Sequence, residues 1–199
     1  MKPTAYFALA LVTLTCLITC RTRSAESTSP KSASQSVSST DLPSNARNAT
    51  DGWHVYTAPD KSFSIEVPCD LSRTDVSAGK NVYEYRCGVD EPMSFFLISV
   101  TNVTDAEAAK MKDELAFERS IKDSFPANRH LTRMVPINIA SGMGREIIVT
   151  NARDEMDNAR ARIIMTSSRR YDVIFIASDL KALESPGAER FLSSFKPLL

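Results

Sequence analysis

From residue 53 to the C-terminus, hydrophobic and polar residues alternate in short runs that are typical of β-strands. The run 63–67 (Phe-Ser-Ile-Glu-Val) has a period of two, which predicts a half-buried strand that ends at Pro68. The runs 94–100 and 171–178 are apolar on both faces, so we expect them to be central strands. Further strands are predicted at 71–76, 82–87, 132–140, 145–151 and 161–168, with the first two forming a hairpin around Gly79.

Two segments have a helical pattern instead. Thr104-Asp-Ala-Glu107 is a capping-box sequence, and it predicts one long helix that runs to about Phe125, where Pro126 ends it. The residues expected to face inward on this helix are Met111, Leu115, Ile121 and Phe125. A short closing helix is expected at 186–195. Successive strands with one helix between them and one at the end predict an α+β fold with a mainly antiparallel sheet.

The first part of the chain has a different pattern. Lys2 precedes an apolar run over residues 5–18, which is typical of a secretory signal and is too short to span a bilayer. The run ends in Leu17-Ile-Thr-Cys20, which resembles the lipobox of bacterial lipoproteins, although Thr19 stands where that pattern has Gly, Ala or Ser. We therefore predict a signal peptide over residues 1–19 and a lipid on Cys20. Ordinary secretion after cleavage elsewhere and an uncleaved anchor are the alternatives.

The segment that follows is rich in Ser, Thr, Ala and Asn and almost lacks large apolar residues. Such a composition does not bury enough surface to offset its ordering entropy, so residues 20–52 are predicted to be a disordered linker. Residues 53–199 are predicted to be a single α+β domain. A lipidated Cys20 would tether this domain to a membrane of the cell envelope. Arg21 follows it in place of the Asp associated with inner-membrane retention, which weakly favours the outer membrane or the periplasmic side.

Composition and charge exclude some classes of function. The chain has 24 basic and 24 acidic residues, a balance that disfavours nucleic-acid binding. The histidines are His54 and His130, and no paired Cys or His spacing indicates a metal site. Gly142-Met-Gly144 leads into a strand and lacks the third glycine of a dinucleotide fingerprint. No nucleophile elbow, P-loop or zinc-protease motif occurs, so we expect neither catalysis nor a cofactor.

Two groups of residues remain as candidates for a structural or binding role: a pair of cysteines and a group of arginines. If the hairpin turns near Gly79, Cys69 and Cys87 come within bonding distance, and export would place them in an oxidising compartment, so a disulfide is predicted. Several arginines crowd the C-terminal strands, and Arg160 and Arg162 share one strand face. With Arg145 and Arg170 they form a possible binding patch for anionic groups. The neighbouring Asp and Glu residues leave a solvated surface of mixed charge as the alternative.

Several short motifs resemble bacterial proteins of the Mog1/PsbP-like superfamily, which includes small DcrB-like envelope lipoproteins. They are Trp53-His-Val-Tyr56, Phe63-Ser-Ile-Glu-Val-Pro68, Gly144-Arg-Glu146, Arg170-Tyr171 and Phe191-Leu-Ser-Ser-Phe195-Lys196. The resemblance covers residues 53–199 and implies an antiparallel sheet flanked by helices. It also implies a role as a binding or assembly accessory, with no shared catalytic residue to carry over.

These observations predict a non-catalytic envelope lipoprotein that contacts the membrane through its lipid and contacts another envelope protein. A carrier of a small or lipidic ligand in a cleft between sheet and helix is the alternative. An unrecognised hydrolase would require Ser, His and a carboxylate to cluster in the folded chain.

Overall fold

The structure is a computed structural model, which describes residues 52–77, 82–90, 93–111, 113–140, 142–151 and 158–198. The predicted signal peptide, Cys20 and nearly all of the predicted linker lie outside the described residues. Within the described part of the chain, no helix is long and apolar enough to cross a membrane.

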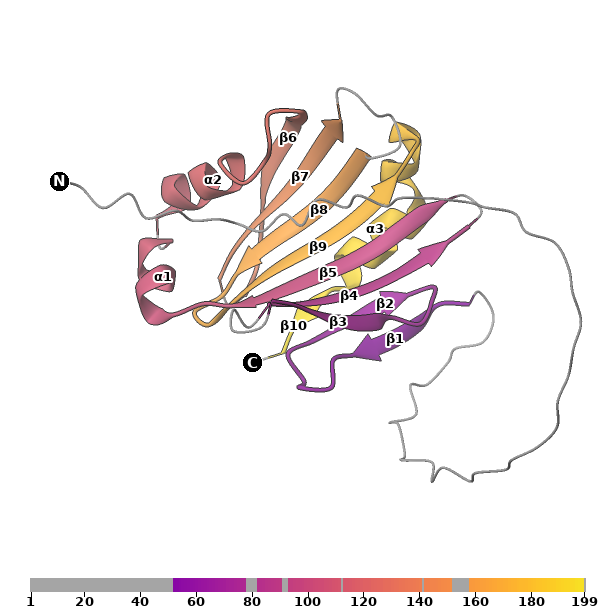
Figure 1. Cartoon of the computed structure of the whole chain (residues 1–199), viewed down its shortest axis with the longest axis horizontal. Helices are drawn as coiled ribbons and strands as arrows, with labels where there is room; N and C mark the ends of the chain where they lie inside the picture. Colours follow the sequence, from indigo (N-terminus) through magenta and orange to yellow (C-terminus); the bar gives the residue numbers. More distant parts are fainter. Residues whose placement is uncertain are drawn as a thin grey trace, which may run out of the picture. The chain divides into compact units, whose positions relative to one another are not determined.

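Most of the domain is one antiparallel sheet (Figure 1). Its seven strands have the order β3-β4-β5-β9-β8-β7-β6, and each neighbouring pair is antiparallel. The predicted central strands β5 and β9 do lie side by side in the interior of the sheet. The strands are β3 (Ser72–Ser77), β4 (Val82–Val89), β5 (Ser94–Asn102), β6 (Arg129–Ile137), β7 (Met143–Asn151), β8 (Asn158–Met165) and β9 (Arg169–Ala177).

One face of this sheet is covered by a smaller sheet and by the C-terminal elements. The small sheet has the order β1-β2-β10, from β1 (His54–Thr57), β2 (Phe63–Val67) and β10 (Lys196–Pro197). Beside it lie the 3-10 helix η2 (Leu180–Glu184) and α3 (Pro186–Ser194). Ile65, Ile98 and Phe191 are each at most 1% exposed in the larger core cluster between these layers. The closing helix and the α+β class are therefore confirmed.

The opposite face carries α1 (Asp105–Lys110) and α2 (Glu114–Lys122). Phe117 and Ile121 of α2 are fully buried in a second, smaller core cluster with side chains from β7 and β8. The single long helix expected over residues 104–125 is therefore wrong. The capping box at Thr104 is present, but it starts only the short α1.

The reason for the break is a second helix cap. Asp113 has an extended backbone, and its carboxylate accepts a hydrogen bond from the Leu115 amide, so it begins a new helix. This restart changes which residues face the sheet. Leu115 was expected to point inward but is 68% exposed, and Phe117 takes the buried position instead. Met111 and Phe125 still pack against the second core cluster, as expected.

The strands predicted at 132–140 and 161–168 lie three residues earlier in the structure, as β6 and β8, and β7 and β9 each begin two residues earlier than predicted. β8 begins at Asn158 and ends at Met165, because Thr166 and Arg169 close the turn to β9 with a backbone hydrogen bond of 2.8 Å. The predicted strand 161–168 already contained Arg162, and the structure extends it back through Arg160 to Asn158. Among the described residues, Glu146 and Glu189 compensate the charges of these two arginines.

The predicted disulfide is present between Cys69 and Cys87, whose Cα atoms are 5.9 Å apart. The hairpin register pairs Ser72 with Arg86, which brings the residues before β3 alongside the end of β4. The bond ties the β2–β3 connection to β4 with a sequence separation of 18 residues. A disulfide that closes a loop of this size stabilises the folded state by roughly 3 kcal/mol, because it restricts the conformations of the unfolded chain.

Candidate functional site: a charged network under α3 and a pocket beside α1

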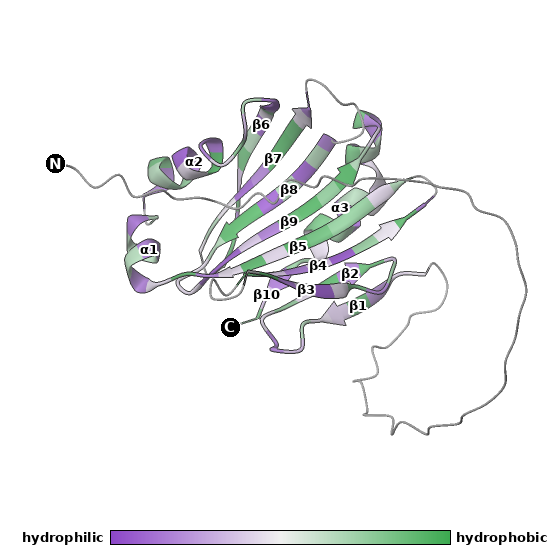
Figure 2. Cartoon of the chain, in the orientation of Figure 1, coloured by the Kyte–Doolittle hydropathy of each residue, from purple (hydrophilic) through white to green (hydrophobic). Residues whose placement is uncertain are grey.

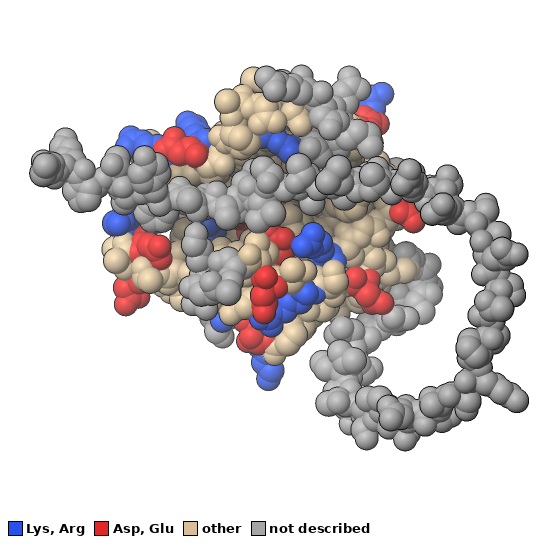
Figure 3. All heavy atoms as spheres, in the orientation of Figure 1, with Lys and Arg blue, Asp and Glu red and all other residues tan. Residues whose placement is uncertain are grey.

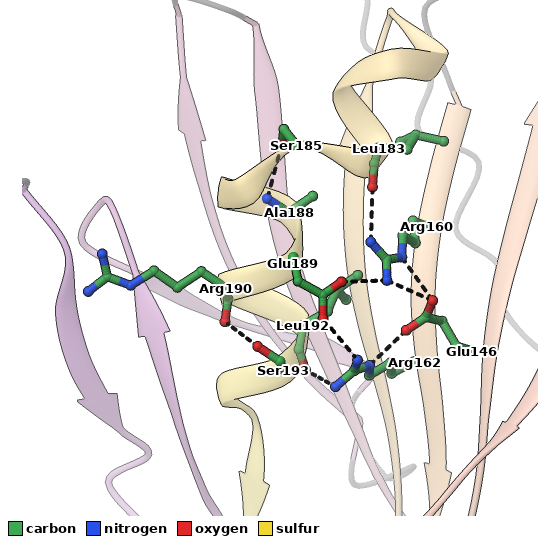
Figure 4. Close-up of polar contacts among 10 residues, drawn as sticks. All are labelled: Glu146, Arg160, Arg162, Leu183, Ser185, Ala188, Glu189, Arg190, Leu192 and Ser193. Carbon is green, nitrogen blue, oxygen red and sulfur yellow. Dashed lines mark hydrogen bonds and ion pairs between the residues drawn. The ribbon is translucent and has the colours of Figure 1, made fainter.

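Two of the arginines that the sequence singled out, Arg160 and Arg162, share the buried carboxylate of Glu146. Glu146 of β7 is the register partner of Arg162 on β8, and Ile148 is the partner of Arg160. Because side chains alternate across a strand, Glu146, Arg160 and Arg162 all project from the same face of the sheet. This face is the one that α3 covers, and Glu189 of α3 points down toward the two arginines (Figure 4).

The distances describe a closed network. Arg160 Nη2 lies 2.8 Å from Glu146 Oε1 and 2.7 Å from Glu189 Oε2. Arg162 Nε lies 3.0 Å from Glu146 Oε2, and its Nη2 lies 3.6 Å from Glu189 Oε1. Two arginines and two glutamates therefore compensate one another in charge.

The same arginines also hold the backbone of the covering elements. Arg160 Nη1 donates a hydrogen bond to the Leu183 carbonyl at 3.3 Å, and Arg162 Nη1 donates to the Leu192 carbonyl at 2.9 Å. Leu183 belongs to η2, and Leu192 lies near the C-terminal end of α3, where carbonyls lack partners within the helix. The network thus fastens α3 and η2 to β7 and β8.

The electrostatics agree with a structural role. Burial alone would raise the pKa of Glu146, but hydrogen bonds from Arg162 and Arg160 outweigh it and lower that pKa below its ordinary value. For Arg160, burial opposes the charge, but the hydrogen bonds to Glu189 and Glu146 prevail and raise its pKa. Both groups are therefore charged at neutral pH, and each one depends on its partners.

The structure does not bring the four predicted arginines into one patch. Arg145 projects from the opposite face, where its side chain is 4% exposed and pairs with Glu118 at 3.1 Å and Glu114 at 3.3 Å. It fastens α2 to the sheet as Arg160 and Arg162 fasten α3. Arg170 lies on the same side as Arg145 and pairs with Asp172 at 2.8 Å. Each of the four arginines therefore has a carboxylate partner in the domain.

A pocket lies beside α1, where β7 begins and β8 ends. Its volume is about 420 Å³. Met143 and Met165 are direct register partners on β7 and β8 and form part of its wall. Gly142 is required at this position because a Cβ there would overlap the carbonyl of Met165. The lining residues are Asp105, Ala108, Ala109, Met111, Gly142, Met143, Met165, Thr166 and Ser167.

The histidines lie apart from both sites. His54 is buried at the start of β1, with Nε2 3.6 Å from a carboxylate oxygen of Asp70, and His130 is exposed on the edge strand β6. Among the described residues, no group of three or more His, Cys, Asp or Glu side chains is arranged to hold a metal ion.

Sequence reasoning found part of the network and missed the rest. The period-two rule placed Arg160 and Arg162 on one face, but Glu146 was noted only as a neighbouring charge. Glu189 gave no signal, because a glutamate on a short amphipathic helix is ordinarily solvated. The pocket had no local signal, since α1, the end of β8 and the start of β7 meet only in the folded chain.

Comparisons with known proteins define the fold. The architecture, a large antiparallel sheet with a few short helices, is PsbP-like. One similar solved structure is the solution structure of cyanobacterial PsbP (CyanoP) from Synechocystis sp. PCC 6803, with a TM-score of 0.51 and 12% sequence identity. The match covers 78% of this chain and 98% of that chain. At this identity the likeness describes the fold alone. No family model matches the chain, and no curated protein matches it.

Proposed function

We propose that this protein is a non-catalytic lipoprotein of the cell envelope, in the manner of the DcrB-like proteins, and that it contacts another envelope protein. The observation that carries the proposal is the order of segments: a lipobox-like Leu17-Ile-Thr-Cys20, a Ser- and Thr-rich segment, and a PsbP-like domain that begins at Trp53. A flexible chain of roughly 30 residues has a root-mean-square span of about 30 Å, so the domain would remain near the membrane.

We also propose that the protein is not an enzyme. The structural role of its buried charged residues supports this part of the proposal. The glutamates and arginines of the network, and Arg145 with its two glutamates, bind elements of the domain to one another. Tyr85 has its pKa raised to about 12, chiefly by burial, and it packs in the larger core cluster. These perturbed groups are explained by packing, so they do not require a reaction site.

The tether is tested by Cys20→Ser in the full-length chain expressed in a bacterial host. We expect the wild-type protein to incorporate labelled fatty acid and to fractionate with membranes, and we expect the variant to lose both properties, because the acyl acceptor is gone. Cys16→Ser is the matched control and should behave as the wild type. Labelling that survives in Cys20→Ser would contradict the proposal, as would a mature N-terminus other than residue 20.

A carrier function is the second candidate, and the pocket beside α1 is the observation that favours it. Its volume is within the range of small-molecule sites, and its walls of Ala and Met side chains suit an apolar ligand. The pocket also lies between the large sheet and helix α1, which is the kind of position that the sequence predicted for a carrier.

Native mass spectrometry of protein purified from cells tests the carrier function. We expect a bound adduct on the wild type that Ala108→Trp, which fills the pocket, removes. Leu115→Trp on the exposed side of α2 should retain the adduct. A wild-type spectrum showing only the apo mass would remove this candidate.

A further inference from the structure

Three methionines meet at the pocket beside α1. Met111 is the C-cap residue of α1, Met143 begins β7 and Met165 ends β8, and the pocket is lined by all three. The whole chain has 7 methionines among 199 residues. Three methionines among the nine described lining residues are therefore a local concentration of thioether side chains. We call Met111, Met143 and Met165 the thioether triad.

The sheet places two members of the thioether triad side by side. Met143 and Met165 are direct register partners, and the Cβ atoms of such partners lie about 4.5–5.5 Å apart in an antiparallel pair. Both side chains project from the face that carries α1 and α2. Ile147 and Ile163, which lie an even number of residues away on the same strands, are buried in the second core cluster on that face. The third member, Met111, packs against the same cluster from the helix side.

The thioether triad is shielded without being sealed inside the core. Met165 is 5% exposed, whereas Met111 and Met143 are half-buried beside a pocket of about 420 Å³. Figure 2 shows the end of β8 coloured as hydrophobic, in contrast to the more polar start of that strand. The pocket is larger than a single ion. Each thioether is carried on three rotatable bonds, however, so its sulfur can move toward a bound ion.

Packing alone does not distinguish these methionines from Met134, and the pocket does. Met134 of β6 also packs against the second core cluster, but it is not among the described residues that line the pocket. Met134 is thus a methionine that fills space in the core, which is the usual role of this side chain. The thioether triad additionally borders a space that a ligand can enter.

The chemistry of the thioether group defines which ligand fits. Thioether sulfur is a soft, uncharged ligand, and soft sulfur ligands select Cu(I) over hard cations. The described cysteines, Cys69 and Cys87, are joined in the disulfide, so the methionines are the sulfur ligands that the described domain offers. Among the described residues, His, Cys, Asp and Glu side chains form no competing group of three or more.

The charges around the pocket are compatible with a bound cation. Asp105 of α1 is exposed and lines the pocket, so its carboxylate can offset a positive charge there. Figure 3 shows acidic side chains over α1, at the left of the view. Two cations lie nearby, Lys110 on α1 and Arg170, the register partner of Met165, and neither is among the described lining residues. Arg170 is paired with Asp172 at 2.8 Å, which compensates its charge.

We propose that the thioether triad is a binding site for Cu(I). The ion binds and leaves in the same oxidation state, so no electron transfer is part of the inference. The inference goes beyond the proposed envelope role and does not require the lipid tether. A metal ion and an apolar ligand would compete for the same pocket.

The test is an anaerobic titration of the full-length chain with Cu(I) in competition with the chromogenic chelator bicinchoninate. Cys16 and Cys20, which lie outside the described residues, are replaced by serine throughout, so that neither can bind Cu(I). We expect one Cu(I) per chain. Met143→Leu and Met165→Leu should each weaken binding by at least about tenfold, because loss of an outer-shell partner alone costs about 10–100-fold in metal affinity.

Met134→Leu is the matched control and should leave the affinity for Cu(I) unchanged. Leucine conserves the volume and apolar character of methionine, so these variants retain the packing and remove only the sulfur. Circular dichroism verifies the fold of each variant. An excess of Mg(II) or Zn(II) should not displace the bound Cu(I). X-ray absorption at the copper edge of the loaded protein should show sulfur ligands, and this measurement needs no substitution.

Several results would overturn the inference. They are the absence of Cu(I) binding against the chelator, equal weakening in Met134→Leu and Met143→Leu, unchanged binding in both pocket variants, and a copper spectrum without sulfur ligands. An organic adduct that persists in Met143→Leu while Cu(I) binding is lost would support the metal site. An adduct on a chain that binds no Cu(I) would overturn the metal site and leave the carrier function. None of these results affects the tether, which fatty-acid labelling tests separately.

Discussion

Glu146→Ala should lower the free energy of unfolding by about 3–5 kcal/mol, because it leaves Arg160 and Arg162 in a largely buried site without their shared carboxylate. The loss of Glu146 also frees the arginines from the geometry in which they hold the carbonyls of Leu183 and Leu192. We therefore expect the attachment of η2 and α3 to weaken first. Chemical denaturation measures the free energy, and hydrogen exchange of the α3 amides locates the weakening.

The pH dependence of stability provides a second test of the role of Glu146. The pKa of Glu146 is lowered in the folded state, so its stabilising contribution is fully present above its unfolded pKa of about 4.5 and is lost as the pH falls through the lowered folded value. The difference in stability between the wild type and Glu146→Ala should therefore shrink on acidification.

The control is the exposed ion pair between Asp75 and Arg73. Asp75→Ala removes this pair and should lower the free energy of unfolding by less than about 1 kcal/mol. If Glu146→Ala and Asp75→Ala lowered the free energy of unfolding equally, the buried network around Glu146 would be contradicted.

Phe63→Ala should cost about 3–5 kcal/mol by leaving a cavity where the small sheet meets the large one. Phe63 of β2 is fully buried. Its ring lies 5.2 Å from that of Tyr85 on β4 and 5.5 Å from that of Phe195 after α3. It therefore joins three elements that are far apart in the sequence, and aromatic pairs of this kind contribute beyond the area they bury. Denaturant titration measures the loss.

The control for Phe63 is Phe95, which has the same side chain in a half-exposed position. Phe95→Ala should cost no more than about 1 kcal/mol, since about half of its surface stays exposed in the folded domain. A large loss at Phe95 would mean that its ring supports the fold despite its exposure, and Phe95 would then be no control for a buried ring. A small loss at Phe63 would contradict the packing of the two sheets around it.

The hydrophobic pattern predicted much of the architecture, and its failures have identifiable causes. The alternation at 63–67 and the apolar run of β9 correctly indicated a half-buried strand and a central strand, because a period of two reflects burial directly. The helix over 104–125 was wrong because Asp113 acts as a cap, and Asp is common enough on helix surfaces that its cap role needs the backbone to be seen. β8 begins three residues before the predicted 161–168, because the polar Asn158 and Arg160 interrupt the apolar pattern that placed its start.

The sequence by itself predicted most strands of the large sheet, the closing helix and the disulfide between Cys69 and Cys87. These features depend on local periodicity, on composition and on residues brought together by a single turn. Only the tertiary structure decided that β9 lies between β5 and β8, that Glu146 and Glu189 share Arg160 and Arg162, and that Phe95 is left uncovered. Those outcomes depend on contacts between distant segments, whose energies come from burial and charge compensation that no local pattern records.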